Sequence, residues 1–225
     1  MIKVVVLIQS VSIEEEITWF ENTHEISLKY EHLLEWMVRG PPITHIDDQV
    51  NFIDRTLLTN VIKAKDIFNE LDIRDINKAR CRANPFENIK NVFFMNRAAL
   101  KMANIDSATG FMFSNLDRDP LHRKKNGAYY FADVCAGPGG FSEYILWRKK
   151  WSFKGFGFTL KGVHDFKLHE STCASGVTFQ SYYGACGDGD VCNPENIADF
   201  RRKVLLHTEG VGVHFMMSDG VSRVR

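Results

Sequence analysis

The ten residues Asp133–Ser142, D-V-C-A-G-P-G-G-F-S, join a β-rich run of the chain to a helical one. The run Tyr129–Ala136 is aromatic and apolar and predicts a short strand. The stretch Phe141–Lys150 then predicts a helix. A strand that leads through a glycine-rich turn into a helix is typical of an open parallel sheet. Ligands of such sheets bind beyond the carboxyl ends of the strands, where this turn lies.

The turn, called here the glycine loop (Cys135–Gly140), has three glycines around one proline. Without Cβ atoms, its backbone can approach a ligand closely and direct N–H groups at it. The spacing is not the G-x-G-x-x-G of dinucleotide folds, and no G-K-[ST] follows, which excludes a P-loop. A tight turn without a ligand is the alternative, but the coincidence of strand, glycines and aromatic helix start favours a cofactor loop.

Strands and helices alternate after the glycine loop. Further strands are predicted at three places: Gly155–Leu160, Val177–Tyr183 and Val213–Ser218. A helix is predicted to open at Pro194, because proline is favourable in a first helical turn. Its apolar residues share one face: Ile197, Phe200, Val204 and Leu205. The alternation predicts an α/β fold with a doubly wound parallel sheet.

Helices are also expected before this sheet. Asp47 or Asp48 can cap a helix that runs to about Leu71 on helical spacing of apolar residues. A second helix is predicted near Asp75–Arg82 and a third over Asn91–Phe113. We expect an irregular segment over 1–43, a helical extension over 44–90 and the sheet domain over 91–225.

Composition sets broad limits. The chain has 225 residues, 44% hydrophobic and 25% charged, and a formal net charge of zero, so nucleic-acid binding would need local basic patches. It has five cysteines, an odd number, and none of them are in C-x-x-C spacing. Both facts argue against a disulfide framework and a zinc ribbon, and they favour free thiols in a reducing compartment. The apolar run Val4–Ile8 is too short to span a membrane and predicts a short strand; Leu116–Gly127 predicts a polar loop.

The string Asp133–Tyr144, D-V-C-A-G-P-G-G-F-S-E-Y, resembles the cofactor loop of FtsJ/RrmJ-type ribose methyltransferases. Within that family it is most similar to eukaryotic members that modify the first transcribed nucleotide of capped mRNA. The resemblance continues through Arg80–Phe86, Phe93–Asn104, Gly155–Lys167 and Met217–Gly220. It implies a Rossmann-like fold, S-adenosyl-L-methionine as cofactor, and methylation of a ribose 2′-oxygen, which forms cap 1.

The family uses a Lys-Asp-Lys-Glu tetrad, and the resemblance implies that Lys101 and Asp219 are its first two catalytic members. Asp219 follows an apolar strand at the ligand edge, where a carboxylate can hold a lysine ammonium in place. A turn cap is the alternative, since Asp-Gly is a common turn pair. The second lysine and the glutamate should lie on later strands. We therefore expect a C-terminally incomplete domain with little activity by itself.

The resemblance also implies a set of cofactor contacts: Asn96, Cys135, Ala136, Gly137, Pro138, Gly139, Gly140, Phe141, Asp190 and Val191. Of these, Asp190 and Val191 would border the adenine. The loop around Asp190 is rich in glycine and aspartate, as some calcium sites are, but it lacks EF-hand spacing. A sulfonium carries its own leaving group, so no metal is expected.

Cap and RNA contacts are implied for a further set: Lys65, Asp66, Ile67, Phe68, Asn69 and Arg80. The family usually has an acidic residue where Asn69 stands. An amide can accept one hydrogen bond from a guanine edge but has no charge to favour 7-methylguanosine. The segment before the sheet is locally basic, which suits phosphate neutralisation: Arg74, Lys78, Arg80, Arg82, Lys90, Arg97 and Lys101.

Three other interpretations stay open. The chain could be an inactive module that holds S-adenosylmethionine or capped RNA, an incomplete chain with no independent role, or an enzyme for a small acceptor. The family implies a nuclear location and the 5′ end of capped mRNA as partner, with the transcription machinery as a further partner of a longer protein. No membrane association is expected.

Overall fold

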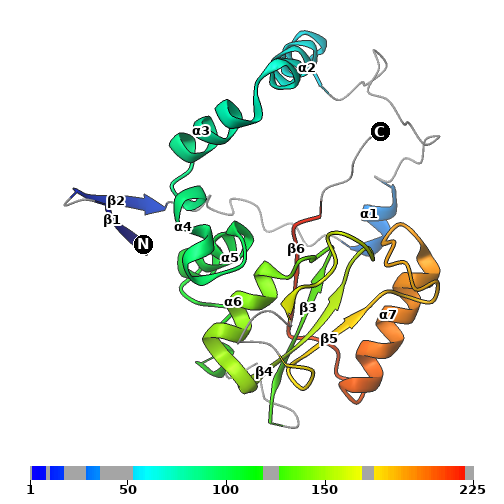
Figure 1. Cartoon of the computed structure of the whole chain (residues 1–225). Helices are drawn as coiled ribbons and strands as arrows, with labels where there is room; N and C mark the ends of the chain where they lie inside the picture. The colour runs from blue at the N-terminus through cyan, green and yellow to red at the C-terminus, as the bar shows by residue number, and fades with distance from the viewer. Residues whose placement is uncertain are drawn as a thin grey trace.

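The computed structural model describes residues 2–8, 11–17, 29–35, 53–118, 127–168 and 175–220. Its centre is a four-stranded sheet in the order β5-β4-β3-β6 (Figure 1). The strands are β3 (Tyr129–Val134), β4 (Phe153–Phe158), β5 (Phe179–Tyr182) and β6 (Phe215–Ser218). Every neighbouring pair is parallel, which confirms the predicted fold class.

Helices cover both faces of this sheet (Figure 1). On one face α5 (Arg97–Ala108) and α6 (Gly140–Lys149) enclose a core that includes Phe131, Ile145 and Phe153. On the other face α7 (Pro194–His207) packs Val204 against Tyr130 and Phe156. Because both faces of β3 are buried, its residues are apolar along nearly its whole length, as in other parallel sheets.

The single helix predicted over Asn91–Phe113 is wrong. The structure has α4 at Phe86–Phe93, a break, and then α5 from Arg97. The side chain of Asn96 caps α5 by accepting a hydrogen bond from the Ala98 N–H at 2.9 Å. An asparagine cap satisfies one of the N–H groups that a helix start leaves without an intrahelical partner. The break therefore follows from a local side chain that competes with helix continuation.

The two helices directly before α4 lie within residues 55–83. The helix α2 (Arg55–Glu70) begins after Asp54, whose side chain accepts the Leu57 N–H at 2.8 Å, so the helix starts later than expected. The predicted caps Asp47 and Asp48 lie outside the described residues. None of the α2 residues is buried, and Figure 1 shows the helix standing away from the sheet. The helix predicted near Asp75–Arg82 is confirmed as α3 (Ile73–Ala83).

The described part of residues 1–43 holds regular structure, not the irregular segment we expected. Strands β1 (Ile2–Ile8) and β2 (Val11–Ile17) form an antiparallel hairpin, and α1 spans Tyr30–Glu35. The strand predicted at Val4–Ile8 is thus confirmed. The proposed domain boundaries stay predictions. In the predicted polar loop, Leu116–Arg118 forms a 3-10 turn, and residues 119–126 are outside the described part.

Two properties of the described residues bear on the classes of function. The cysteines among them are free thiols: Cys81, Cys135, Cys186 and Cys192. None of the helices in the described ranges is both long and apolar enough to cross a membrane.

Candidate active site

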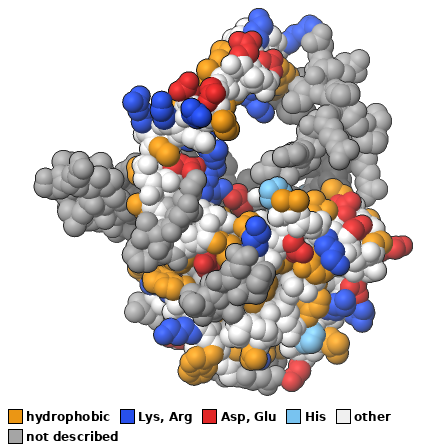
Figure 2. All heavy atoms as spheres, viewed as in Figure 1, with side chains coloured by type: hydrophobic (Ala, Val, Ile, Leu, Met, Phe, Trp, Pro, Cys, Tyr) orange, Lys and Arg blue, Asp and Glu red, His pale blue; other side chains and the backbone are white. Residues whose placement is uncertain are grey.

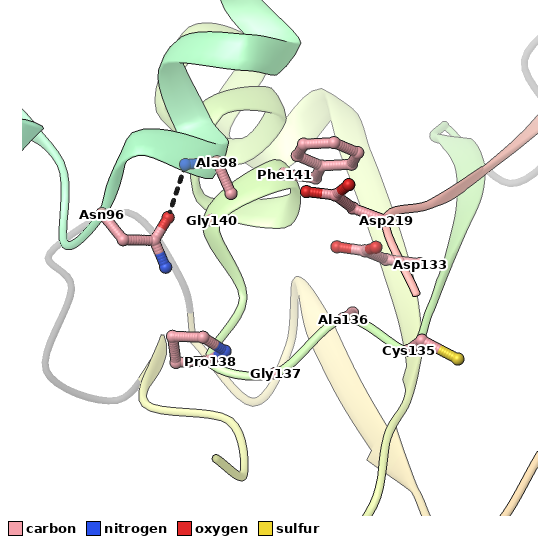
Figure 3. A pocket seen from close by; sticks show the side chains of 10 residues that line it. All are labelled: Asn96, Ala98, Asp133, Cys135, Ala136, Gly137, Pro138, Gly140, Phe141 and Asp219. Atoms are coloured by element: carbon pink, nitrogen blue, oxygen red, sulfur yellow. Dashed lines mark hydrogen bonds between the residues drawn. The ribbon is translucent and has the colours of Figure 1, made fainter. Parts of the chain in front are cut away.

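A pocket opens where the carboxyl ends of β3 and β6 meet the first turns of α5 and α6 (Figure 3). The pocket has a volume of about 310 Å³, which includes the solvent-filled space at its open mouth. Its lining comes from the glycine loop and its surroundings: Asn96, Ala98, Asp133, Cys135, Ala136, Gly137, Pro138, Gly140, Phe141 and Asp219. This is the edge at which open α/β sheets bind ligands.

Most of the residues that the resemblance implied for the cofactor lie together in this lining. Gly140 permits a close approach, because a Cβ there would lie 2.2 Å from Asn96 Oδ1 and 2.9 Å from Ala98 Cβ. At Gly137 a Cβ would lie 1.8 Å from the carbonyl oxygen of His164. These two glycines let the loop pack between the start of α5 and the segment after β4.

Gly139 is placed differently from its neighbours. Its φ is +114°, in the left-handed region that favours glycine, and it does not line the pocket. A Cβ there would lie 2.7 Å from Cγ of Leu168, in the protein core. Gly139 therefore shapes the turn and does not offer its Cα to a ligand in the pocket.

Asp133 is a lining residue that the sequence reasoning missed. It is buried at the end of β3 and accepts hydrogen bonds from Ser142 N at 3.1 Å and Ser142 Oγ at 2.7 Å. Burial raises its pKa to about 7, against the lowering effect of Ser142, and the nearby Asp219 adds to the rise. The sequence does carry a signal for it, since a carboxylate directly precedes the glycine loop in an otherwise apolar strand.

Cys135 also lines the pocket, and Figure 3 shows its sulfur pointing away from Asp133. Burial, followed by the Cys192 and Asp133 side chains, raises the pKa of its thiol. A thiol that stays protonated is a poor nucleophile. The raised thiol pKa therefore does not favour covalent catalysis by Cys135.

Lys101 and Asp219 meet at the pocket, 118 residues apart in sequence. Lys101 Nζ donates a hydrogen bond to Asp219 Oδ2, and both side chains are close to half exposed. Asp219 itself lines the pocket, beside Asp133 and Phe141 in Figure 3. The two residues that the resemblance named as catalytic are thus in contact at the mouth of the glycine-loop pocket.

A second missed residue, Glu143, fixes the segment that carries Asn96. Glu143 is buried in the first turn of α6, and its Oε2 accepts the Met95 N–H at 2.9 Å. This bond ties the break between α4 and α5 to the helix that follows the glycine loop. A negative side chain in a first helical turn is also favoured by the helix dipole.

Asp190 and Val191 follow β5 and do not line the pocket. Their loop is held by the buried side chain of Asn196, whose Nδ2 donates to Asp188 Oδ1 at 2.7 Å and to the Asp190 carbonyl at 3.0 Å. The Asp188 carbonyl accepts the Lys161 N–H at 2.8 Å, which fastens the loop to the end of β4. The loop therefore sits at the same sheet edge as the pocket.

The residues implied for the cap are not brought to the pocket. Lys65–Asn69 lie on α2 and are exposed, and Arg80 lies on α3, where its Nη2 is 3.4 Å from Glu87 Oε1. No cluster of metal-ligating side chains occurs within the described ranges.

Comparison with known proteins agrees with this geometry. Residues 94–225 match the FtsJ-like methyltransferase family, a range that contains every residue of the pocket lining. The chain is similar to proteins named cap-specific mRNA (nucleoside-2′-O-)-methyltransferase 1. It is 48% identical to that of Xenopus laevis over 213 residues, which cover 92% of this chain and 25% of the relative. The Homo sapiens relative is 50% identical over 215 residues (92% and 26%).

The Drosophila melanogaster protein of the same name is 41% identical over 217 residues, which cover 94% of this chain and 27% of the relative. The chain thus spans about a quarter of the length of the curated relatives it matches. The family match covers more than half of the chain, including the sheet, the glycine loop and the Lys101–Asp219 contact. The chain belongs to the FtsJ-like methyltransferase family.

Proposed function

We propose that this chain provides the cofactor pocket and two catalytic residues of an enzyme that methylates capped mRNA. The enzyme transfers a methyl group from S-adenosyl-L-methionine to the ribose 2′-oxygen of the first transcribed nucleotide. The observation that carries the proposal is the contact between Lys101 and Asp219 at the mouth of the glycine-loop pocket. The names of the relatives support the substrate and the position of the methyl group.

The pocket fits S-adenosyl-L-methionine in its chemistry. Its floor is the backbone of the glycine loop, packed so tightly that Gly137 and Gly140 have no room for a Cβ. Asp133 and Asp219 supply carboxyl groups, and Phe141 an aromatic ring, which suit a ligand with a sulfonium and an ammonium. When bound, the cofactor supplies an electrophilic methyl group together with its leaving group.

The side chains at the mouth would position the acceptor. Asp219 holds the Lys101 ammonium in one place, so that Nζ can donate a hydrogen bond to the ribose 2′-oxygen. Such a donor stabilises negative charge on the oxygen as its proton leaves. It also restricts the oxygen to positions near the pocket, which favours an in-line approach to the methyl group. We assign proton removal to the second lysine of the family tetrad.

The remaining expectations belong to this proposal. Lys65–Asn69 on α2 and Arg80 on α3 would contact the cap and the RNA, and Asp190 and Val191 would border the adenine. The exposure of α2 leaves its side chains accessible for such a contact. We also propose a nuclear location, with capped mRNA as the partner and the transcription machinery as a partner of the longer protein.

The test is methyl transfer by a chimera in which this chain replaces the matching stretch of the Xenopus laevis relative. Two capped RNAs are compared, one with a 2′-hydroxyl on the first nucleotide and one with a 2′-deoxyribose there. Label from S-adenosylmethionine should enter the first RNA alone. Label in both RNAs would contradict ribose methylation, and label in neither, with the cofactor still bound, would favour an inactive binding module.

A further inference from the structure

Two arginines converge on one buried carboxylate beside the pocket. Glu87, on α4, has a side chain only 3% exposed. Its Oε1 contacts Arg80 Nη2 at 3.4 Å and also Arg97 Nη1. The arginine side chains keep much of their surface in solvent, 50% for Arg80 and 39% for Arg97. Both arginine side chains are therefore accessible to another partner.

The charge balance of this trio points to an anion. One carboxylate faces two guanidiniums, so the trio carries a net charge of about +1 at neutral pH. Arg97 also stands in the first turn of α5, where the helix dipole disfavours cations, and that turn has no acidic residue. The pairing with Glu87 offsets part of this unfavourable placement.

The trio also lies on the way to the pocket. Arg97 stands between Asn96 and Ala98, which both line the pocket. Lys101 is one turn further along α5 on the same face, and it contacts Asp219. Figure 2 shows lysine and arginine side chains gathered over α3, from which Arg80 comes. The basic groups thus form a path from α3 to the mouth of the pocket.

We propose that Arg97 and Arg80, oriented by Glu87, bind a backbone phosphate of the RNA strand that carries the acceptor ribose. This inference rests on the proposed function and adds Arg97 as a binding residue and Glu87 as a positioning residue. A guanidinium has five N–H donors in a planar fork, so the edge turned away from Glu87 can still pair with phosphate oxygens. Charge-assisted bonds of this kind fix the register of a nucleic acid without reading its sequence.

The test measures binding of a short capped RNA to this chain by fluorescence anisotropy at several salt concentrations. Arg97→Gln should weaken binding about tenfold, the value of one hydrogen bond to a charged group. It should also make the dependence of log K on log salt shallower by about 0.7, as for one lost phosphate contact to a single strand. Arg97→Lys keeps the charge but not the fork, and should restore the salt dependence and only part of the affinity.

Arg202→Gln is the matched control. Arg202 also pairs with a carboxylate, Asp199 at 2.5 Å, but on α7, which covers the other face of the sheet (Figure 1). This variant should bind RNA like the unaltered chain. Equal losses in the Arg97 and Arg202 variants, or no loss in either, would overturn the phosphate site.

The variant Glu87→Gln tests whether Glu87 orients the two guanidiniums or only changes the electrostatic attraction of the site for RNA. The change removes a negative charge, so attraction alone would raise RNA affinity. Because Glu87 orients both guanidiniums, we expect RNA affinity to fall about tenfold at unchanged cofactor affinity. A rise in RNA affinity would overturn the role of Glu87.

Measuring cofactor binding distinguishes a failure of this inference from a failure of the proposed function. Retained S-adenosylmethionine binding with unaltered RNA affinity in Arg97→Gln would count against the phosphate site alone. An unaltered chain that binds neither the cofactor nor RNA at low salt would overturn both.

Discussion

At the scale of single residues, the contact between Lys101 and Asp219 depends on the fold and places both side chains at the candidate active site. Lys101 lies on α5 and Asp219 directly after β6, so the contact forms only when the helix packs beside the sheet. The pair is near half exposed, and exposed ion pairs add only about 0–1 kcal/mol to stability. A role in positioning the acceptor explains the pair better than a role in stability.

Lys101→Ala should therefore lower methyl transfer in the chimera while sparing the melting temperature and cofactor affinity. Loss of one donor that stabilises developing charge typically lowers kcat by about 10²–10³. Lys203→Ala is the control, because Lys203 pairs with Asp199 at 3.0 Å on α7, away from the pocket. Full activity in Lys101→Ala, or the same loss in both variants, would remove Lys101 from the mechanism.

Asp133 predicts a pH dependence of stability. Burial raises its pKa from 3.8 to about 7, so its protonated form is favoured in the folded state. This contribution is fully present below about pH 4 and is lost as pH rises to about 7, with roughly 1.4 kcal/mol lost for each pH unit in between. Asp133→Asn should remove it, and chemical unfolding across this range would show the difference. Identical pH profiles for both proteins would refute the assignment.

At the scale of elements, a buried polar network joins α5 to α6. Asp106 is fully buried on α5 and accepts hydrogen bonds from Tyr144 Oη at 2.9 Å, Phe113 N at 3.0 Å and Ser114 N at 3.2 Å. Arg148 Nε lies 3.9 Å from its Oδ2. The network fixes the distance between the helix that carries Lys101 and the helix that follows the glycine loop.

Asp106→Ala should lower the free energy of unfolding by about 3–5 kcal/mol, because it leaves buried donors and a partly buried cation without a partner. Denaturant unfolding followed by circular dichroism measures this. Asp75→Ala removes an exposed carboxylate that pairs with Lys78 at 3.6 Å and should change stability by under about 1 kcal/mol. Similar effects of the two changes would mean that the Asp106 network contributes little.

The elements also show what the sequence could and could not predict. The strands were found because buried parallel strands are apolar, and the glycine loop because its glycines interrupt that pattern. The Asn96 cap at the break before α5 is a local signal that the periodicity of apolar residues does not include, whereas Glu143, which also fixes the break, is 48 residues from Met95. Asp133 was missed because its burial depends on tertiary packing. Local periodicity carries no information on such distant partners.

At the scale of the whole molecule, the sheet brings together the two sequence regions that make the pocket. The glycine loop follows β3, and Asp219 follows β6, which pairs directly with β3. Of the strands that the structure describes, β6 lies at one edge of this sheet. Met217 of β6 is buried, whereas its neighbour Met216 is exposed. Met217 packs in the core beneath α5 and α6, which explains the difference.

The most direct test of the account is calorimetric titration of this chain with S-adenosyl-L-methionine, beside two alanine variants. Gly140→Ala places a Cβ 2.2 Å from Asn96 Oδ1, whereas Gly176→Ala adds one in open space. We predict one cofactor per chain, with binding lost in Gly140→Ala and unchanged in Gly176→Ala. No binding by the unaltered chain, or equal affinity in all three proteins, would contradict the assignment of the glycine-loop pocket.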